Sequence, residues 1–253
     1  MIKYFKRGMS FIKKMILSDD YHCVLKYYGK SSGKQPDIRQ NVPFGKLAEK
    51  VIEDKNTSLY YERLYSIFNS LENLRLRLKT DDEIVCAEVG VYKGGGSYFI
   101  SSVLETLGFK KYKLYSIDTF EGHSELDFLK EKTEGVHEAG LFYETSFETV
   151  SKYLSKYQNI EVLKGRIQDK ADMIKDFKFS FVHLDMDIYQ PTVFALDFFS
   201  SRIIIGGIVI LDDYEFQTCP GIKKAIDEFL ATNKNFVQVP LLSGQCQLIK
   251  ISE

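Results

Sequence analysis

From about residue 84 onward, short runs of consecutive apolar residues alternate with segments whose apolar residues recur at every third or fourth position. Runs of about four to eight apolar residues are typical of strands buried on both faces, and the wider spacing is typical of amphipathic helices. The expected strands are IVCAEV (84–89), YKLYSI (112–117), IEVL (160–163), FSFVHLD (179–185) and GIVIL (207–211). The expected helices cover residues 97–107, 147–157, 171–177, 193–199 and 222–230. This alternation predicts an α/β fold with a doubly wound, mostly parallel sheet.

The last two strands are expected to run in opposite directions. FVQVP (236–240) and CQLIKI (246–251) are joined only by LLSGQ. This link is too short for the crossover that parallel neighbours need, but it suits a hairpin. A C-terminal antiparallel hairpin distinguishes the expected fold from a plain dinucleotide-binding domain.

Residues 1–57 are expected to form an N-terminal helical extension or cap, and residues 58–253 the main domain. Residues 1–17 place Lys and Arg among Ile, Phe, Met and Leu, a pattern that can wind as a basic amphipathic helix. We expect a docking helix or a frayed tail there, with peripheral contact to an anionic membrane as the alternative. Residues 18–45 contain Gly, Ser and Pro with little periodicity and predict an irregular connector. After Ser58, apolar residues recur at helical spacing and predict a helix that flanks the sheet.

The composition fits one catalytic domain. The chain has 253 residues, 44% hydrophobic and 27% charged, which is enough for one full core. Its 34 Lys and Arg residues nearly balance 35 Asp and Glu residues, so a net charge of -1 gives no field that attracts nucleic acid. The four cysteines lack CxxC spacing, which argues against structural zinc and a disulfide framework and favours the cytoplasm. No apolar run is long enough to span a membrane.

A glycine-rich turn follows the first strand of the expected sheet. In AEVGVYKGGGS the strand ends in Glu88, and Gly90, Gly94 and Gly95 allow a tight turn and a close approach of the backbone to a ligand, ahead of Ser97. The spacing matches neither the GxGxxG fingerprint nor a P-loop. The turn therefore favours a charged ligand other than a pyrophosphate.

Polar residues also follow the second and third strands. Asp118 comes directly after YKLYSI, where an acidic side chain can accept hydrogen bonds from ribose hydroxyls. Gln168 and Asp169 follow the third strand and can line the edge of an adenine. The alternative for Asp118 and for Asp169 is a cap on the following helix. An adenosine-containing cofactor is the favoured interpretation.

A pair of aspartates comes at the end of each of the fourth and fifth expected strands. Asp185 and Asp187 lie in FVHLDMDIY, and Asp212 and Asp213 lie in GIVILDDY. The carboxyl ends of parallel strands meet in one crevice, where several carboxylates repel one another unless a divalent cation neutralises them. Oxygen ligands with no cysteine expected beside them suit Mg²⁺, Mn²⁺ or Ca²⁺. Such pairs alone are also common as caps and turn formers, but next to the glycine turn they favour a cation-assisted transferase.

Five motifs occur in order between about residues 84 and 230: EVGVYKGGGS, SIDTFEG, FVHLDMDIYQPT, GGIVILDDY and CPGIKKAIDEF. With them the chain resembles the macrocin O-methyltransferase family, whose members use S-adenosylmethionine and a metal to methylate sugar hydroxyls of natural products and surface glycans. The resemblance implies a class I methyltransferase fold, Rossmann-like, with a seven-stranded sheet. Members of the family often assemble as oligomers, so a homo-oligomer is expected.

The resemblance also implies roles for the singled-out residues. Asp185, Asp212 and Asp213 would hold Mg²⁺, and Asp187 would be the general base. Glu88 and the glycines after it would form the cofactor loop, and the aspartate after the second strand would contact the ribose.

His183 and Cys219 have two interpretations each. His183 lies on the same side of its strand as Asp185, as a hydrogen-bonded structural residue or as a reserve base. Cys219 precedes Pro220, which suits an early helical position, so a structural role is favoured over a nucleophilic thiol.

An acidic insertion covers residues 121–145 and contains His123 and His137. Loops at this edge of such a sheet set specificity, so the insertion is expected to shape the acceptor pocket, with a solvated helix as the alternative.

The chain is therefore expected to be an S-adenosylmethionine- and Mg²⁺-dependent O-methyltransferase acting on a hydroxyl of a sugar or another diol-bearing small molecule. A cation that chelates two neighbouring hydroxyls lowers their pKa and orients one of them. The alternatives are a metal-dependent glycosyltransferase with a DxD motif and a noncatalytic protein that binds S-adenosylmethionine.

Overall fold

The computed structural model describes residues 37–128 and 135–253. The basic segment 1–17 and most of the connector 18–45 lie outside these residues, so the expectations for them stay predictions. The described chain from Ile38 onward belongs to one compact unit.

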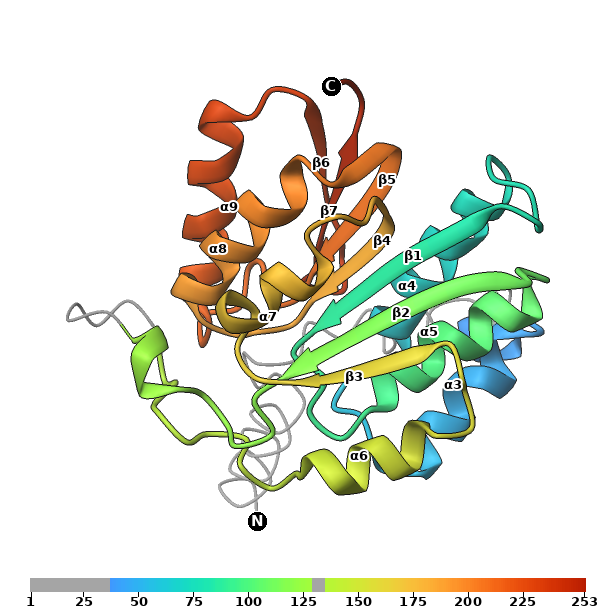
Figure 1. Cartoon of the computed structure of the whole chain (residues 1–253), viewed down its shortest axis with the longest axis horizontal. Coiled ribbons are helices and arrows are strands. Elements are labelled where there is room, and N and C mark those ends of the chain that lie inside the picture. Colours follow the sequence, from blue (N-terminus) through green and yellow to red (C-terminus); the bar gives the residue numbers. More distant parts are fainter. Residues whose placement is uncertain (1–36, 129–134) are drawn as a thin grey trace, which may run out of the picture. The chain divides into compact units, whose positions relative to one another are not determined.

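The expected seven-stranded sheet is confirmed, with strand order β3-β2-β1-β4-β5-β7-β6 (Figure 1). Neighbours among the first five strands are parallel, β7 is antiparallel to β5, and β6 is antiparallel to β7. The strands are β1 (Glu83–Val89), β2 (Lys111–Asp118), β3 (Ile160–Lys164), β4 (Phe179–Leu184), β5 (Ile203–Leu211), β6 (Phe236–Pro240) and β7 (Cys246–Lys250). The short link after β6 therefore forms the expected antiparallel hairpin.

Helices cover both faces of the sheet, as Figure 1 shows. One face carries α3 (Phe44–Glu53), α4 (Tyr61–Arg75), α5 (Gly95–Thr106) and α6 (Phe147–Leu154). The other carries α7 (Ile167–Ile174), α8 (Tyr189–Ser200) and α9 (Pro220–Thr232). Side chains alternate along a strand, so Val85, Ala87 and Val89 of β1 join the core on one face, while Ile84 and Cys86 join the core on the other. Both cores are apolar because every central strand is buried on both sides.

Several helices differ from the sequence expectation, α3 and α7 among them. α3 begins at Phe44, in a region expected to be irregular, and Phe44, Ala48 and Val51 are buried in the core that α4 and α5 share. Their spacing of four and three residues is helical, but a ten-residue pattern next to a proline-rich stretch is easily overlooked. α7 begins at Ile167, four residues before the expected start, because Ile167 already packs in the core. The division of the chain at residue 57 stays a prediction.

The start of α9 follows the expected local rule. Pro220 is the first residue of the helix, and Cys219 immediately before it is buried. The fixed φ of proline suits this position because the first helical N–H groups have no partner within the helix. In residues 37–128 and 135–253, no helix has the length and apolar character to cross a membrane.

Candidate active site

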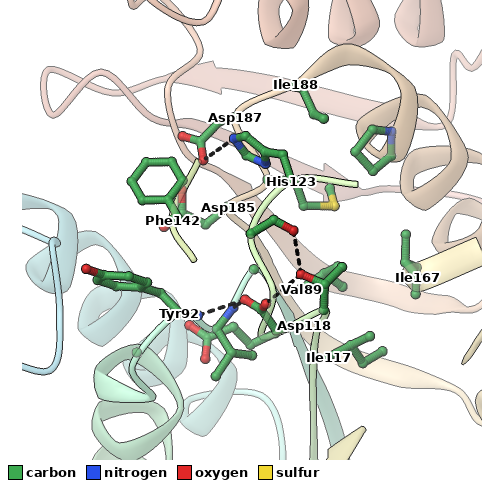
Figure 2. A pocket seen from close by; sticks show the side chains of 18 of the residues that line it. Val89, Tyr92, Ile117, Asp118, His123, Phe142, Ile167, Asp185, Asp187 and Ile188 are labelled. Atoms are coloured by element: carbon green, nitrogen blue, oxygen red, sulfur yellow. Dashed lines mark hydrogen bonds and ion pairs between the residues drawn. The ribbon is translucent and has the colours of Figure 1, made fainter. Parts of the chain in front are cut away.

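A cavity of about 180 Å³ opens at the carboxyl ends of β1, β2 and β4. This is the edge of a doubly wound sheet where ligands bind. Figure 2 shows its labelled side chains, which come from the ends of these strands, from α7 and from the insertion after β2. The turn after β1 lines one part of the cavity, and Asp185 and Asp187 after β4 line another.

Gly90 brings the ends of β1 and β4 together. Its φ of +89° lies in the left-handed region, and a Cβ there would lie 1.7 Å from the carbonyl oxygen of Asp185. No side chain fits this position. Gly94 caps α5 at a φ of +90°, and Gly95 donates its N–H to the carbonyl of Asn56 at 2.8 Å, but neither lines the cavity.

Asp118 lines the cavity and also holds the turn after β1. One carboxylate oxygen accepts the N–H groups of Val91 and Tyr92 at 2.7 and 2.8 Å, and the other accepts the N–H of Phe120 at 2.7 Å. Three backbone donors thus join the turn and the carboxylate into one unit. The Thr119 hydroxyl lies a further 3.4 Å from Oδ1.

Glu88 starts a chain of buried polar residues beneath the cavity. Its carboxylate accepts from the hydroxyl of Ser97 and pairs with His183 Nδ1 at 3.0 Å. His183 Nε2 pairs in turn with Asp212 Oδ1 at 3.0 Å. Burial alone would lower the pKa of His183, but Asp212 and Glu88 raise it well above its usual value. His183 thus lies between two carboxylates that favour its protonated form, and neither it nor Ser97 lines the cavity.

Gln168 and Asp169 lie next to each other but face different surroundings. Gln168 lines the cavity and donates to the buried Asp127 at 3.0 Å, while its own amide oxygen is buried without a partner among the described residues. Asp169 is outside the cavity and pairs with Arg166 at 2.9 Å. Of the two, only Gln168 is placed to contact a ligand.

The four aspartates after β4 and β5 gather on the other wall, as their strand positions predict. Asp185, Asp187 and Asp213 line the cavity, and Asp212 lies behind them, buried. Asp187 and Asp213 adopt φ values of +62° and +60°. A non-glycine residue in this region costs of order 1 kcal/mol or more, and such strain is typical of functional sites.

Arg63 and Gln245 complete this cluster, and the sequence analysis did not identify either. Arg63 on α4 donates to Asp212 Oδ2 at 2.8 Å and to Asp213 Oδ1 at 2.5 Å. Gln245, in the link before β7, donates to Asp212 Oδ1. The signal for Arg63 was an arginine on the apolar face of a helix, four residues before the buried Ile67. Gln245 left no such signal.

The acidic residues differ in the direction of their pKa shifts. Burial would raise the pKa of Asp212, but Arg63 and His183 lower it to about 2. Burial raises the pKa of Asp185 well above its usual range, and Asp212 and Asp213 raise it further. Burial, Asp185 and Asp213 do the same for Asp187. Within the described chain, two cationic side chains thus face five carboxylates counting Glu88.

A divalent cation fits this arrangement. Asp185 has no hydrogen-bond donor among residues 37–128 and 135–253, so its oxygens are open to a ligand. Asp213 uses only one oxygen for Arg63, and Asp212 retains a lone pair on Oδ2. Hard carboxylate oxygens are the ligands that Mg²⁺ and Ca²⁺ take. A bound cation would relieve the repulsion that raises the pKa of Asp185.

The insertion after β2 contributes to both sides of the cavity. Ser124 and Asp127 lie on the side of Gln168, while His123 and Phe142 lie on the side of Asp187. Burial, together with His137, lowers the pKa of His123 to about 4. In the described part of the insertion, the only helix is the three-residue 3₁₀ turn η2 (Glu125–Asp127), so the solvated-helix alternative does not apply there.

Cys219 lies closer to the aspartates than the sequence suggested. Its Sγ is 4.0 Å from Asp187 Oδ1 and 3.3 Å from His137 Nε2. The premise that no cysteine stands beside the acidic residues is therefore wrong, because the turn before α9 folds back onto the end of β4. Burial, Asp213 and Asp187 raise the pKa of this thiol well above its usual value, so it is not an activated nucleophile.

Comparison with known proteins finds curated relatives of this chain. The chain is 28% identical over 139 residues to 8-demethyl-8-(2,3-dimethoxy-alpha-L-rhamnosyl)-tetracenomycin-C 4'-O-methyltransferase of Streptomyces olivaceus, covering 52% of this chain and 53% of that protein. It is 24% identical over 151 residues to demethyldecarbamoylnovobiocin O-methyltransferase of Streptomyces niveus, covering 57% of each. The chain thus spans about half the length of these curated relatives.

The fold is similar to that of the solved O-methyltransferase NovP, with a TM-score of 0.68, 20% identity, and coverage of 78% of this chain and 83% of that one. The family model for macrocin-O-methyltransferase (TylF) matches residues 63–243, from the buried arginine of α4 to the link before β7. The match covers most of the described domain and every acidic residue of the site. The chain belongs to the macrocin-O-methyltransferase (TylF) family.

Proposed function

We propose that the chain transfers a methyl group from S-adenosylmethionine to a hydroxyl of a sugar or a related diol-bearing small molecule, with the help of a divalent cation, preferably Mg²⁺. The observation that carries the proposal is the pairing of two unlike walls in one cavity. Asp118 and Gln168 line one side, and Asp185, Asp187 and Asp213 line the other. Membership of a methyltransferase family supports the same conclusion.

The donor side is formed by the turn after β1 and the residues that follow β2 and β3. In this proposal Asp118 accepts a ribose hydroxyl at Oδ1, where the Thr119 hydroxyl lies 3.4 Å away, because Oδ2 is already used by two backbone donors. The orphaned amide oxygen of Gln168 is placed to accept from an adenine amino group. In this proposal Glu88, Gly94, Gly95 and Ser97 act indirectly, by fixing the turn and the start of α5 on which the donor lies.

The cation side is formed by Asp185, Asp212 and Asp213. These carboxylates would hold Mg²⁺, which would supply Lewis-acid chemistry that lowers the pKa of chelating hydroxyls. Arg63 lowers the pKa of Asp212 and fixes the direction of Asp212 and Asp213 through two hydrogen bonds. Gln245 and His183 fix Asp212 from the other side.

Asp187 is the proposed general base, in preference to His183. Asp187 lines the cavity, whereas both ring nitrogens of His183 are paired with carboxylates, which raise its pKa, and His183 does not line the cavity. The acceptor oxygen forms its bond to the methyl carbon as the carbon–sulfur bond breaks with its electron pair left on sulfur, and the hydroxyl proton passes to Asp187. A carboxylate of raised pKa is suited to take a proton near neutral pH.

The acceptor class is carried over from the relatives. Their names specify O-methylation of a rhamnosyl tetracenomycin and of a novobiocin precursor. For this chain we propose a glycosidic small molecule, not nucleic acid, because the net charge of -1 gives no basic surface field. A cytoplasmic location and a homo-oligomeric state are part of the same proposal.

The test is a binding and turnover experiment on the full chain. Calorimetry should detect saturable binding of S-adenosylmethionine and none of nucleotide sugars, and transfer of a labelled methyl group to a panel of glycosides should stop when EDTA is added. Binding of nucleotide sugars instead of S-adenosylmethionine would replace the proposal with a glycosyltransferase. Binding of the donor without transfer to any glycoside or polyol would leave a noncatalytic cofactor-binding protein.

A further inference from the structure

Two imidazoles from the insertion lie beside Asp187, on the acidic side of the cavity. His123 Nε2 is 3.1 Å from His137 Nδ1 and 3.8 Å from Asp187 Oδ2. The three ligand atoms lie within 4.8 Å of one another. Figure 2 shows His123 and Asp187 directed at each other across the cavity wall. The proposed binding of the donor and of Mg²⁺ uses neither histidine.

These distances suit one small ion. Zn–N and Zn–O bonds of about 2.0–2.2 Å place two ligands of the same ion at most about 4.4 Å apart. The two measured contacts fall within that limit. Two imidazoles and one carboxylate, with a remaining position open to a cavity, form a set that suits zinc and other first-row transition metals. Mg²⁺ prefers an octahedral set of oxygens and is a poor match.

We propose that His123, His137 and Asp187 form a second divalent-metal site, separate from the site at Asp185, Asp212 and Asp213 and selective for Zn²⁺ over Mg²⁺.

Cys219 supports this site from outside the ligand set. Its Sγ is 3.3 Å from Nε2 of His137, the ring nitrogen opposite the one that faces His123. With the thiol donating to Asp187 and Nε2–H donating to the sulfur, Nδ1 of His137 is left as an acceptor that points into the cluster. A metal-ligating histidine typically donates its second nitrogen in this way, which fixes its tautomer and orientation.

The backbone of the insertion holds the two histidines in place. His123 accepts from Gly140 N–H at 2.8 Å and donates to the carbonyl of Leu141 at 3.0 Å, which closes the loop around His137. At Gly135 a Cβ would lie 2.1 Å from the carbonyl oxygen of Thr218, so the loop packs directly against the segment that carries Cys219. The cluster is therefore held from both sides before any ion binds.

Occupancy of this site would inhibit methyl transfer. An ion bound to Asp187 prevents that carboxylate from taking the acceptor's proton and narrows the acceptor side of the cavity. This consequence, unlike the binding itself, rests on the proposed function.

The test measures Zn²⁺ binding first and activity second. The full chain, freed of metal by a chelator, is titrated with Zn²⁺ against a chromophoric chelator in the presence of excess Mg²⁺. One Zn²⁺ per chain should bind, and His137→Asn and His123→Asn should each weaken its affinity about tenfold or more. The matched control is His22→Asn, with Cys23→Ser as a second, because both residues lie outside the described part of the chain and could bind zinc adventitiously. Circular dichroism checks that each variant is folded.

Equal Zn²⁺ affinity in the wild type and both histidine variants, or no binding that survives excess Mg²⁺, would overturn the proposal. In an active preparation, Zn²⁺ should inhibit the wild type and inhibit His137→Asn at least several-fold less. If Zn²⁺ binds as expected but no methyl transfer is found under any condition, the second site stands and the proposed function fails.

Discussion

Asp118 and Asp185 face one cavity from the ends of β2 and β4, the two strands that flank β1, and their side chains have different partners. Asp118 accepts three backbone N–H groups at 2.7–2.8 Å. Asp185 has no donor in the described part of the chain and sits against Asp212 and Asp213, which raise its pKa beyond the effect of burial. Backbone donors surround the first carboxylate, whereas the second is the one that the proposed cation would neutralise.

The comparison matches the proposal that one sheet edge binds a methyl donor next to a cation. The Asp118 wall is preorganised, because its hydrogen bonds fix the turn after β1 without a ligand. On the Asp185 wall, burial and like charges destabilise the ionised form, and strained backbone at Asp187 and Asp213 holds the side chains there. Variants on the two walls should therefore fail in different ways.

The largest effect is expected on the acidic wall. Asp187→Asn removes the proposed base and should lower kcat by about 10²- to 10⁴-fold while the Kd for S-adenosylmethionine stays the same. Steady-state kinetics and calorimetry check the two quantities. Asp197→Asn, on the exposed face of α8, is the matched control and should leave both unchanged. A variant at position 187 that keeps its full kcat would remove this residue from the mechanism.

Arg63→Met tests the internal neutralisation of the same wall. Without the guanidinium, Asp212 and Asp213 lose their buried partner, which should cost about 3–5 kcal/mol in the free energy of unfolding. Added Mg²⁺ should recover part of this loss, because a cation can replace the missing charge. Urea unfolding with and without Mg²⁺ measures both effects. A loss that Mg²⁺ does not reduce would argue against a cation site beside Arg63.

A smaller and different effect is expected on the Asp118 wall. Asp118→Asn weakens the hydrogen bonds to Val91 and Tyr92, worth about 1.5–3 kcal/mol each when the acceptor is charged. The turn should loosen, and the Kd for S-adenosylhomocysteine should rise about tenfold or more by calorimetry, with no change in Mg²⁺ affinity. Asp169→Asn is the control, because Asp169 forms an exposed pair worth at most about 1 kcal/mol.

The smallest effect is expected at Gln245. Gln245→Leu removes one donor from Asp212, whose other donors are Arg63 and His183. The free energy of unfolding should fall by about 1–3 kcal/mol, the range for a lost hydrogen bond to a buried charge. Thermal unfolding in chelator-treated protein measures it. A neutral result would mean that Asp212 is held by Arg63 and His183 alone.

The sheet and the acidic cluster could be predicted because both depend on local sequence. Each strand is a continuous apolar run, and each aspartate follows such a run, so the topology of a parallel sheet places them together. The link LLSGQ set the direction of the last two strands in the same way. The family motifs lie in these same segments.

The partners of the aspartates could not be predicted, because they come from distant parts of the chain. Arg63 precedes Asp212 by 149 residues, and only the packing of α4 on the sheet directs it there. His137 and Cys219 are 82 residues apart and meet because the insertion packs on the turn before α9. The structure also shows that Asp118 holds the turn after β1 through hydrogen bonds to Val91 and Tyr92. Its position after a strand does not reveal this role.

The most direct test of the account is a crystal structure of the chain with S-adenosylhomocysteine and Mn²⁺, in which anomalous scattering locates the ion. We predict the ion within coordination distance of Asp185 and Asp213, and the cofactor between Asp118 and Gln168 with its sulfur directed at Asp187. An ion that is not coordinated by Asp185 would contradict the account. So would a cofactor bound outside this cavity.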